Sequence, residues 1–316
     1  MAKVGKKRTF SYVHIFACMR PLLFLFVLWM LFFGCKSEQP QHTSVWQGSG
    51  VVVYTDYEPF ALKNMRVFYY VPTKVTAATP IVFVLHGAER NALEYRNAII
   101  NKAEQKGFIA VVPEFSEINF PGVNGYQLGN IYVNGDSPTV ASLLPEAEWA
   151  LSVIEPLFSY VKVQTQNNNS SYHMIGHSGG AQYAHRFLLC KRQLRLQKLV
   201  ISAAGWYTAT DPAVNFPYGL SNSLLEGVDL APLLAQKVFV QVGTADNSTT
   251  TTAIRRDALA EAQGASRLAR AQFFFQKASS RATALSAPFQ WELHLIPGLG
   301  HDFNQSLPHS ADLLFP

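Results

Sequence analysis

Short, continuous apolar runs recur along this chain and alternate with segments of helical spacing. Residues 81–85 (IVFVL) and 108–112 (FIAVV) form two such runs, and residues 92–106 between them keep helical spacing up to Gly107. Apolar runs of this length are typical of strands that are buried on both faces, and their alternation with helices indicates a parallel sheet. The expected fold class is therefore α/β, with a mostly parallel central sheet and helices on both faces.

The same pattern extends over the body of the chain, which we expect to form one domain over residues 49–316. Hydrophobic residues make up 48% of the 316 positions, which excludes a disordered chain. Further strands are predicted at 50–55 and 65–71, as a hairpin, and at 171–175, 197–202, 237–242 and 290–296. Further helices are predicted at 144–161, at 179–191 and within 252–277. The remaining long irregular segments are 114–140 and 205–236.

The basic charge of the chain is concentrated at its N-terminus. Five of the 26 Lys and Arg residues lie in residues 1–34, which hold no acidic residue. From residue 35 onward, 21 basic residues are balanced by 21 acidic residues. A nucleic-acid surface needs clustered basic charge on the folded domain, so we expect no nucleic-acid partner.

The N-terminal segment has the pattern of an export signal. A basic stretch precedes an apolar run of 13 residues at 21–33, which is shorter than the roughly 20 residues of a comfortable bilayer span. Gly34 and Cys35 follow, and then a polar stretch. The pattern indicates a secretory signal, and the position of Cys35 makes it resemble a bacterial lipoprotein signal.

That resemblance implies a signal peptide over residues 1–34, a lipid on Cys35, and a polar tether over residues 35–48. No Asp follows Cys35, so the resemblance implies an enzyme anchored to the outer membrane. Phe32 and Phe33 stand where lipoprotein signals prefer Leu and a small residue, so an uncleaved signal anchor and simple secretion stay open. All three alternatives place the body in the cell envelope or beyond it, outside the cytoplasm.

Cysteine use gives no support for a disulfide or a metal site in the body. The three cysteines are Cys18, Cys35 and Cys190, and cleavage at Cys35 would leave Cys190 as the single unmodified thiol. The sequence has no spaced Cys and His cluster of the kind that binds zinc. We therefore predict no metal and no cofactor.

Residues 176–180 (GHSGG) fit the pattern G-x-S-x-G between a predicted strand and a predicted helix. In a nucleophile elbow the Ser sits on a sharp, strained turn, so the positions two residues before and after it must be small. Gly176 and Gly180 meet that demand, and Ser178 is the candidate nucleophile. The alternative is a flexible turn whose serine only caps the helix.

A nucleophilic serine needs a base, and the base needs an orienting carboxylate. His301 lies in a glycine-rich loop after the last predicted strand and is the candidate base. Asp246 follows the strand at 237–242 and is the candidate acid, with Asp211 as its competitor. The chain order Ser, Asp, His is the order expected for an α/β-hydrolase. His177 adjoins the nucleophile and is expected to line the site.

Four segments together resemble an α/β-hydrolase of the esterase kind, close to secreted polyhydroxyalkanoate-depolymerase-like and feruloyl-esterase-like enzymes. They are LHGAERNA at 85–92, GHSGG at 176–180, VGTADN at 242–247 and PGLGHDF at 297–303. The resemblance implies that the backbone amides of Ala88 and Gly179 form an oxyanion hole.

The predicted function is hydrolysis of carboxylic esters, small or polymeric, through an acyl-enzyme. A non-catalytic envelope binding protein and a serine peptidase of the same fold are the alternatives. Tyr126 and Trp206, in the two long segments, are candidates for lining the substrate site. The sequence leaves the choice of ester and the oligomeric state open.

Overall fold

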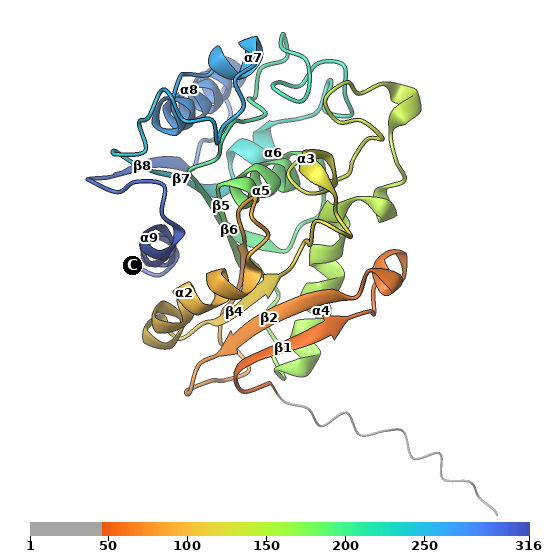
Figure 1. The fold of residues 1–316 in the computed structure, drawn as a ribbon, viewed down its shortest axis with the longest axis vertical. Helices are drawn as coiled ribbons and strands as arrows, with labels where there is room; N and C mark the ends of the chain where they lie inside the picture. Colours follow the sequence, from red (N-terminus) through yellow and green to blue (C-terminus); the bar gives the residue numbers. More distant parts are fainter. Residues whose placement is uncertain (1–45) are drawn as a thin grey trace, which may run out of the picture. The chain divides into compact units, whose positions relative to one another are not determined.

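The strands pair into one sheet within residues 46–316, the part of the chain that this computed structural model describes (Figure 1). Its eight strands lie in the order β1-β2-β4-β3-β5-β6-β7-β8. They are β1 (Gly48–Tyr54), β2 (Met65–Val71), β3 (Ile81–Leu85), β4 (Ile109–Pro113), β5 (Tyr172–His177), β6 (Leu196–Ser202), β7 (Lys237–Gly243) and β8 (Trp291–Ile296). Strands β3 to β8 are parallel, and at one edge β2 pairs antiparallel with β4 and β1 pairs antiparallel with β2, so the expected mostly parallel sheet is confirmed.

Helices cover both faces of this sheet (Figure 1). They are α2 (Ala92–Lys106), α3 (Gly122–Gly125), α4 (Ile154–Gln164), α5 (Gly179–Cys190), α6 (Ala231–Leu234), α7 (Ala258–Glu261), α8 (Arg267–Leu285) and α9 (Phe303–Leu314). Short 3-10 helices are η1 (Glu58–Lys63), η2 (Val140–Ser142), η3 (Glu146–Glu148) and η4 (Ala150–Val153). Helices α2 and α9 pack on one face, and α4, α5 and α8 pack on the other.

Strand β3 explains why the predicted strands read as continuous apolar runs. Phe83 and Leu85 belong to the core that contains α4, α5 and α8. Val82 and Val84, which alternate with them, belong to the core under α2 and α9. Because successive side chains point to opposite faces and both faces are covered, every position of this strand must be apolar.

The N-terminal hairpin forms as predicted, but the packed body begins earlier than the predicted boundary at residue 49. Strands β1 and β2 pair antiparallel along their whole length. The indole of Trp46 stacks on Tyr69 with ring centroids 4.0 Å apart, and its amide donates to the carbonyl of Gln164 at 3.0 Å. Trp46 and Gly48 therefore belong to the body rather than to the predicted tether over 35–48, because the large apolar indole gains stability from burial.

The predicted signal peptide over 1–34 and the predicted lipid site Cys35 lie outside the described residues. Among residues 46–316, none of the helices combines the length and the hydropathy that crossing a bilayer requires.

The predicted helix over residues 144–161 is wrong in its first half. Residues 146–153 form the two 3-10 turns η3 and η4, and the α-helix α4 starts only at Ile154. Pro156 explains the difference, because a proline has no amide hydrogen and its ring collides with the carbonyl four residues earlier in a continuing helix. Placed in the first turn of α4, Pro156 loses no hydrogen bond.

The C-terminal helix α9, which contains Pro308 in its interior, was not predicted from the sequence. Asp302 caps this helix, and its side chain accepts a hydrogen bond from the amide of Asn304 at 2.9 Å.

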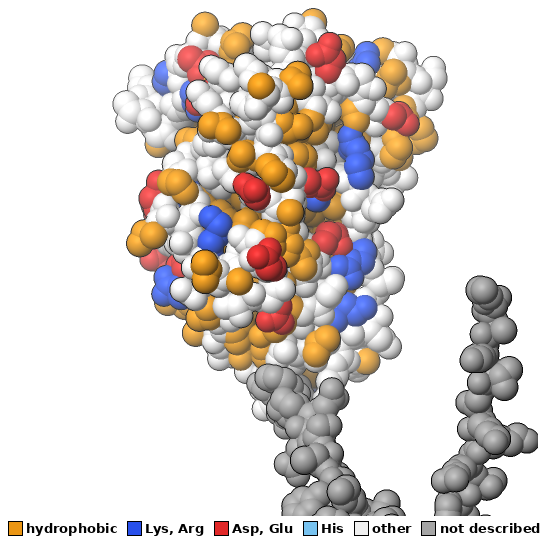
Figure 2. All heavy atoms as spheres, turned by 90° about the vertical axis from the view of Figure 1, so that its right-hand side faces the viewer, with side chains coloured by type: hydrophobic (Ala, Val, Ile, Leu, Met, Phe, Trp, Pro, Cys, Tyr) orange, Lys and Arg blue, Asp and Glu red, His pale blue; other side chains and the backbone are white. Residues whose placement is uncertain are grey.

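On the face drawn in Figure 2, Lys and Arg side chains are interspersed with Asp and Glu side chains, in keeping with the balanced charge of the body.

Candidate active site

Ser178 stands alone between the end of β5 and the start of α5. Its backbone has φ 56° and ψ −116°, a strained conformation for a residue with a side chain. The turn is so tight that a Cβ on Gly176 would lie 2.3 Å from the carbonyl oxygen of Gly180. A Cβ on Gly180 would lie 2.2 Å from the carbonyl oxygen of Leu85. The glycines of GHSGG are therefore required by close backbone approach, which is the geometry of a nucleophile elbow.

The structure brings Ser178, His301 and Asp246 into one chain of hydrogen bonds. His301 Nε2 lies 3.0 Å from Ser178 Oγ, and His301 Nδ1 lies 2.8 Å from Asp246 Oδ2. Each side chain follows the C-terminal end of a parallel strand: Ser178 follows β5, Asp246 follows β7, and His301 follows β8. The carboxyl ends of parallel strands meet at one edge of an open sheet, so side chains from distant parts of the sequence converge there.

Asp211, the competing candidate for the acid, lies elsewhere. Its Oδ2 accepts from Lys277 Nζ at 2.9 Å, and its Oδ1 accepts from the amide of Ala213 at 3.0 Å. The bond with Lys277 is the main cause that lowers the pKa of the Asp211 carboxyl. The geometry therefore assigns the carboxylate beside His301 to Asp246.

The backbone after β3 lies against the start of α5. A Cβ on Gly179 would lie 3.0 Å from the amide nitrogen of Ala88, and neither of these two amides has a hydrogen-bond partner among residues 46–316. His86 holds the loop, because its Nε2 accepts from the amide of Phe115 at 3.0 Å and its Nδ1 then donates to the carbonyl of Gly87 at 2.9 Å. Burial lowers the pKa of His86 to about 4, so its imidazole is neutral at pH 7.

A cavity of about 310 Å³ opens over these groups. Ser178, His301 and Ala88 line it together with His177 and Phe303. Burial lowers the pKa of His177 well below its usual range, so this ring is neutral as well. Two unpartnered amides and a hydrogen-bonded serine beside one cavity are the arrangement that acyl transfer requires.

Comparison with known proteins places the chain in a family. No protein-family model and no curated protein matches the sequence. The chain is similar in structure to poly(aspartic acid) hydrolase-1 from Sphingomonas sp. KT-1, with 33% identity, a TM-score of 0.78, and coverage of 85% of this chain and 99% of that chain. The chain belongs to the α/β-hydrolase family.

Other solved structures agree with this assignment. The α/β-hydrolase is similar to the poly(3-hydroxybutyrate) depolymerase LpqC from Bordetella parapertussis, with 27% identity, a TM-score of 0.77, and coverage of 85% of this chain and 90% of that chain. An S-formylglutathione hydrolase from Agrobacterium tumefaciens shares the fold at 18% identity, with a TM-score of 0.53 and coverage of 84% and 92%. The expected fold is thereby confirmed, and the neighbours identify the chain as a hydrolase.

Sequence reasoning missed Arg267, the first residue of α8. Arg267 lines the cavity, and its Nη1 lies 3.3 Å from Asp246 Oδ1, the carboxylate oxygen that His301 does not use. The amide of Leu268 donates to the backbone carbonyl of Asp246 at 3.1 Å. The start of α8 thus holds both the side chain and the backbone of the acid. The sequence predicted a helix-rich segment here, but nothing in it indicated which loop the first turn contacts.

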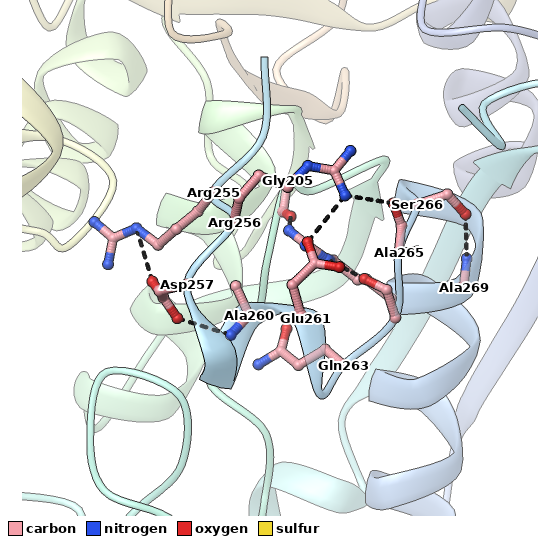
Figure 3. Close-up of polar contacts among 12 residues, drawn as sticks. Gly205, Arg255, Arg256, Asp257, Ala260, Glu261, Gln263, Ala265, Ser266 and Ala269 are labelled. Carbon is pink, nitrogen blue, oxygen red and sulfur yellow. Dashed lines mark hydrogen bonds and ion pairs between the residues drawn. The ribbon is translucent and has the colours of Figure 1, made fainter. Parts of the chain in front are cut away.

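The segment before α8 is fixed by its own network of polar contacts (Figure 3). Arg256 Nη1 donates at 2.9 Å both to Glu261 Oε1 and to the carbonyl of Ala265. Ser266 caps α8 by accepting from the amide of Ala269 at 3.2 Å. These contacts fix the position from which Arg267 reaches the acid.

Two residues predicted to line the substrate site do not line this cavity. Tyr126 is fully buried, and its hydroxyl donates to the carbonyl of His86 at 2.8 Å, so it supports the loop from behind. Trp206 is held between two guanidinium groups, with Arg186 Cζ 4.1 Å and Arg255 Cζ 4.5 Å from the ring centroid. Both aromatic rings gain more from burial and from these contacts than they would from facing solvent.

Proposed function

We propose that this α/β-hydrolase cleaves carboxylic esters by a serine-dependent mechanism through an acyl-enzyme. The observation that carries the proposal is the hydrogen-bonded chain of Ser178, His301 and Asp246 beside the cavity. Ser178 Oγ attacks the carbonyl carbon of the ester while His301 Nε2 takes the hydroxyl proton. Asp246 accepts the Nδ1 proton of the same ring, which fixes the tautomer and stabilises the imidazolium that forms.

The negative charge of the tetrahedral intermediate would fall on the former carbonyl oxygen. The unpartnered amides of Ala88 and Gly179 are positioned to donate to it, and each donor of this kind is worth about 3–4 kcal/mol. The bond to the alcohol oxygen then breaks, and His301 returns its proton to that oxygen. Water attacks the acyl carbon by the same route in reverse, which releases the acid and restores Ser178.

The substrate would be a small or polymeric ester. The two neighbours of higher identity are named for polymers, poly(aspartic acid) and poly(3-hydroxybutyrate). The first polymer consists of an amino acid, whose units are joined by amide bonds, so a second candidate function is amide hydrolysis at the same Ser178. A non-catalytic binding protein is the remaining alternative, and the assembled hydrogen-bonded chain speaks against it.

Labelling and turnover test the proposal together. Wild-type protein should react with a fluorophosphonate probe and hydrolyse a panel of short-chain esters, and Ser178→Ala should lose both. By comparison with the loss of a catalytic serine in a protease, we expect kcat to fall about 10⁴- to 10⁶-fold. Circular dichroism checks that the variant is folded. More than a few per cent residual activity in a folded variant would remove Ser178 from its role, and amide cleavage without ester cleavage would favour the second candidate.

We also propose that the enzyme is anchored in the cell envelope through lipid on Cys35, with a signal peptide over 1–34. The proposal depends on the apolar run at 21–33 and the Gly34-Cys35 pair. Cys35→Ser should block processing and shift the protein between the membrane and soluble fractions. Mass spectrometry of the mature N-terminus is the decisive measurement, because an intact Met1 with unmodified Cys35 would leave the signal anchor instead.

A further inference from the structure

Three separate segments of the candidate site contact a single tyrosine. Tyr95 lies in the first turn of α2 and is 2% exposed. Its hydroxyl lies 2.9 Å from His177 Nδ1, in the turn that carries Ser178. Its ring stacks on Phe303, two residues after His301, with centroids 4.3 Å apart and planes 10° from parallel.

The third contact of Tyr95 is with the loop of the proposed oxyanion hole. A Cβ on Gly87 would lie 2.9 Å from the tyrosine hydroxyl oxygen, so the backbone just before Ala88 rests against that oxygen. Burial raises the pKa of Tyr95, so its hydroxyl stays protonated at neutral pH. The hydroxyl oxygen therefore lies between the backbone of Gly87 and the imidazole of His177.

His177 contacts both Tyr95 and the proposed base His301. Its ring stacks on His301 with centroids 4.8 Å apart and planes 30° from parallel. His177 is buried and neutral, and the hydrogen bond between its Nδ1 and the Tyr95 hydroxyl holds the orientation of its plane. A fixed plane on one side of His301 restricts the rotation of that imidazole between Ser178 and Asp246.

The helix that carries Tyr95 is firmly attached on the far side. Helix α2 packs with α9 against the sheet, and Lys102 Nζ lies 2.6 Å from Asp312 Oδ2 between the two helices. Helix α9 begins at Phe303, so the same pair of helices holds both partners of the stacked rings. Tyr95 therefore connects the oxyanion loop, the nucleophile turn and the loop of the base to one rigid helix pair.

We infer that Tyr95 is a positioning residue, which sets the proposed base and the proposed oxyanion hole relative to each other through its hydroxyl and its ring. The inference rests on the proposed function. Tyr95 is among the residues that line the cavity, but its hydroxyl is bonded to His177 and not to Ser178 Oγ, so loss of that hydroxyl should impair the transition state more than the binding of substrate.

Tyr95→Phe is the first test, because it removes the hydroxyl and keeps the stacked ring. With a chromogenic short-chain ester we expect kcat to fall about tenfold, as for the loss of one well-placed hydrogen bond, and KM to stay within twofold. The second-order rate of fluorophosphonate labelling should fall by a similar factor. Affinity for a boronic acid, which mimics the tetrahedral intermediate, should weaken in the same proportion.

Tyr183→Phe is the matched control. The hydroxyl of Tyr183 is also buried and donates to the carbonyl of Ala150 at 2.8 Å, and Tyr183 does not line the cavity. This variant should lower the midpoint of thermal unfolding but keep kcat within twofold. If both variants lowered kcat alike, or if Tyr95→Phe kept the kcat and labelling rate of the wild type, the inference would be overturned.

A double variant tests the route through His177. His177→Phe keeps a ring beside His301 but removes the hydrogen-bond partner of the tyrosine hydroxyl. In that background Tyr95→Phe should cause little further loss of kcat, since contacting residues of one network are not additive. Fully additive losses would overturn the route. Ser178→Ala in the same assays distinguishes failure of the proposed function from failure of the role of Tyr95. If Ser178→Ala kept activity, the proposed function would fail. If Ser178→Ala lost activity while Tyr95→Phe kept it, only the role of Tyr95 would fail.

Discussion

The loops at the carboxyl ends of the strands and the two long segments of this hydrolase differ in what they contribute. A single residue, Ser178, separates β5 from α5, and Asp246 and His301 lie three and five residues after the ends of β7 and β8. The segments 114–140 and 205–236 are 27 and 32 residues long, yet neither contributes a side chain to the lining of the cavity. Residues fixed directly to strand ends are held by the sheet, whereas long segments must first be held by their own packing.

The aromatic side chains of the long segments perform that packing. Tyr126, Trp206 and Phe216 are all buried. The two segments also enclose a second cavity of about 570 Å³, larger than the first, and Phe216 and Tyr218 line it. Aromatic content in a long loop is therefore a poor guide to the substrate site, because a long loop needs an apolar core of its own before it can present anything.

The test with the largest expected effect replaces one aspartate by asparagine in each of the two regions. Asp246→Asn should lower kcat about 10⁴-fold, the size of the wrong-tautomer effect in a serine protease. Asp211→Asn, in the long segment, should change kcat by less than about threefold, since its partner is the surface Lys277. Steady-state kinetics on one ester measures both. The reversed order would mean that the acid lies in the long segment.

A second test asks whether Trp206 serves stability rather than turnover. Trp206→Ala should lower the free energy of unfolding by about 3–5 kcal/mol, because it empties a buried site between two guanidinium groups. The remaining folded protein should keep its kcat/KM within a few fold. Denaturant unfolding and kinetics on the same preparation measure the two quantities. A large rise in KM without loss of stability would instead support the sequence prediction that Trp206 lines the substrate site.

The smallest expected effect is on the pH dependence of the free energy of unfolding, and it comes from a histidine in the central sheet. Burial lowers the pKa of His173, on β5, to about 4, against about 6.5 in an unfolded chain. Between these two pH values the unfolded state binds more protons, so the free energy of unfolding falls as the pH drops below 6.5, by at most about 1.4 kcal/mol per pH unit. In His173→Leu this contribution is absent.

Denaturant titrations at pH 7 and pH 5 compare the wild type with His173→Leu. We expect the wild type to lose about 1–2 kcal/mol more than the variant over this interval. Equal losses in both proteins would show that His173 does not take up a proton on unfolding.

The elements predicted well are those whose local sequence already dictates their geometry. The apolar run at 81–85 predicted a strand buried on both faces, the run at 237–242 predicted a strand, and GHSGG at 176–180 could form its turn only with glycine where the backbones meet. The positions of Ser178, Asp246 and His301 followed from these strands, because parallel strands end at a common edge. The structure brings these three predicted side chains together.

The elements that were missed depend on contacts that no local pattern encodes. The spacing over 144–161 looks helical, but Pro156 forces the helix to begin late. Arg267 and Tyr95 belong to helices whose amphipathic pattern says that one side is buried, but not which loop it meets. The contacts of Arg267 with Asp246, and of Tyr95 with His177, are tertiary and appear only once α8 and α2 are packed.

The order of the parts along the chain has a consequence for synthesis. Ser178 and His301 are 123 positions apart, and His301 follows β8, the last strand added to the sheet. A chain emerging from the ribosome therefore carries its serine long before the histidine that would activate it. A product that stops before residue 291 lacks that histidine and leaves β7 as an open edge. By this arrangement a nascent or truncated chain stays catalytically silent until residues 291–301 have been made and the proposed triad can assemble.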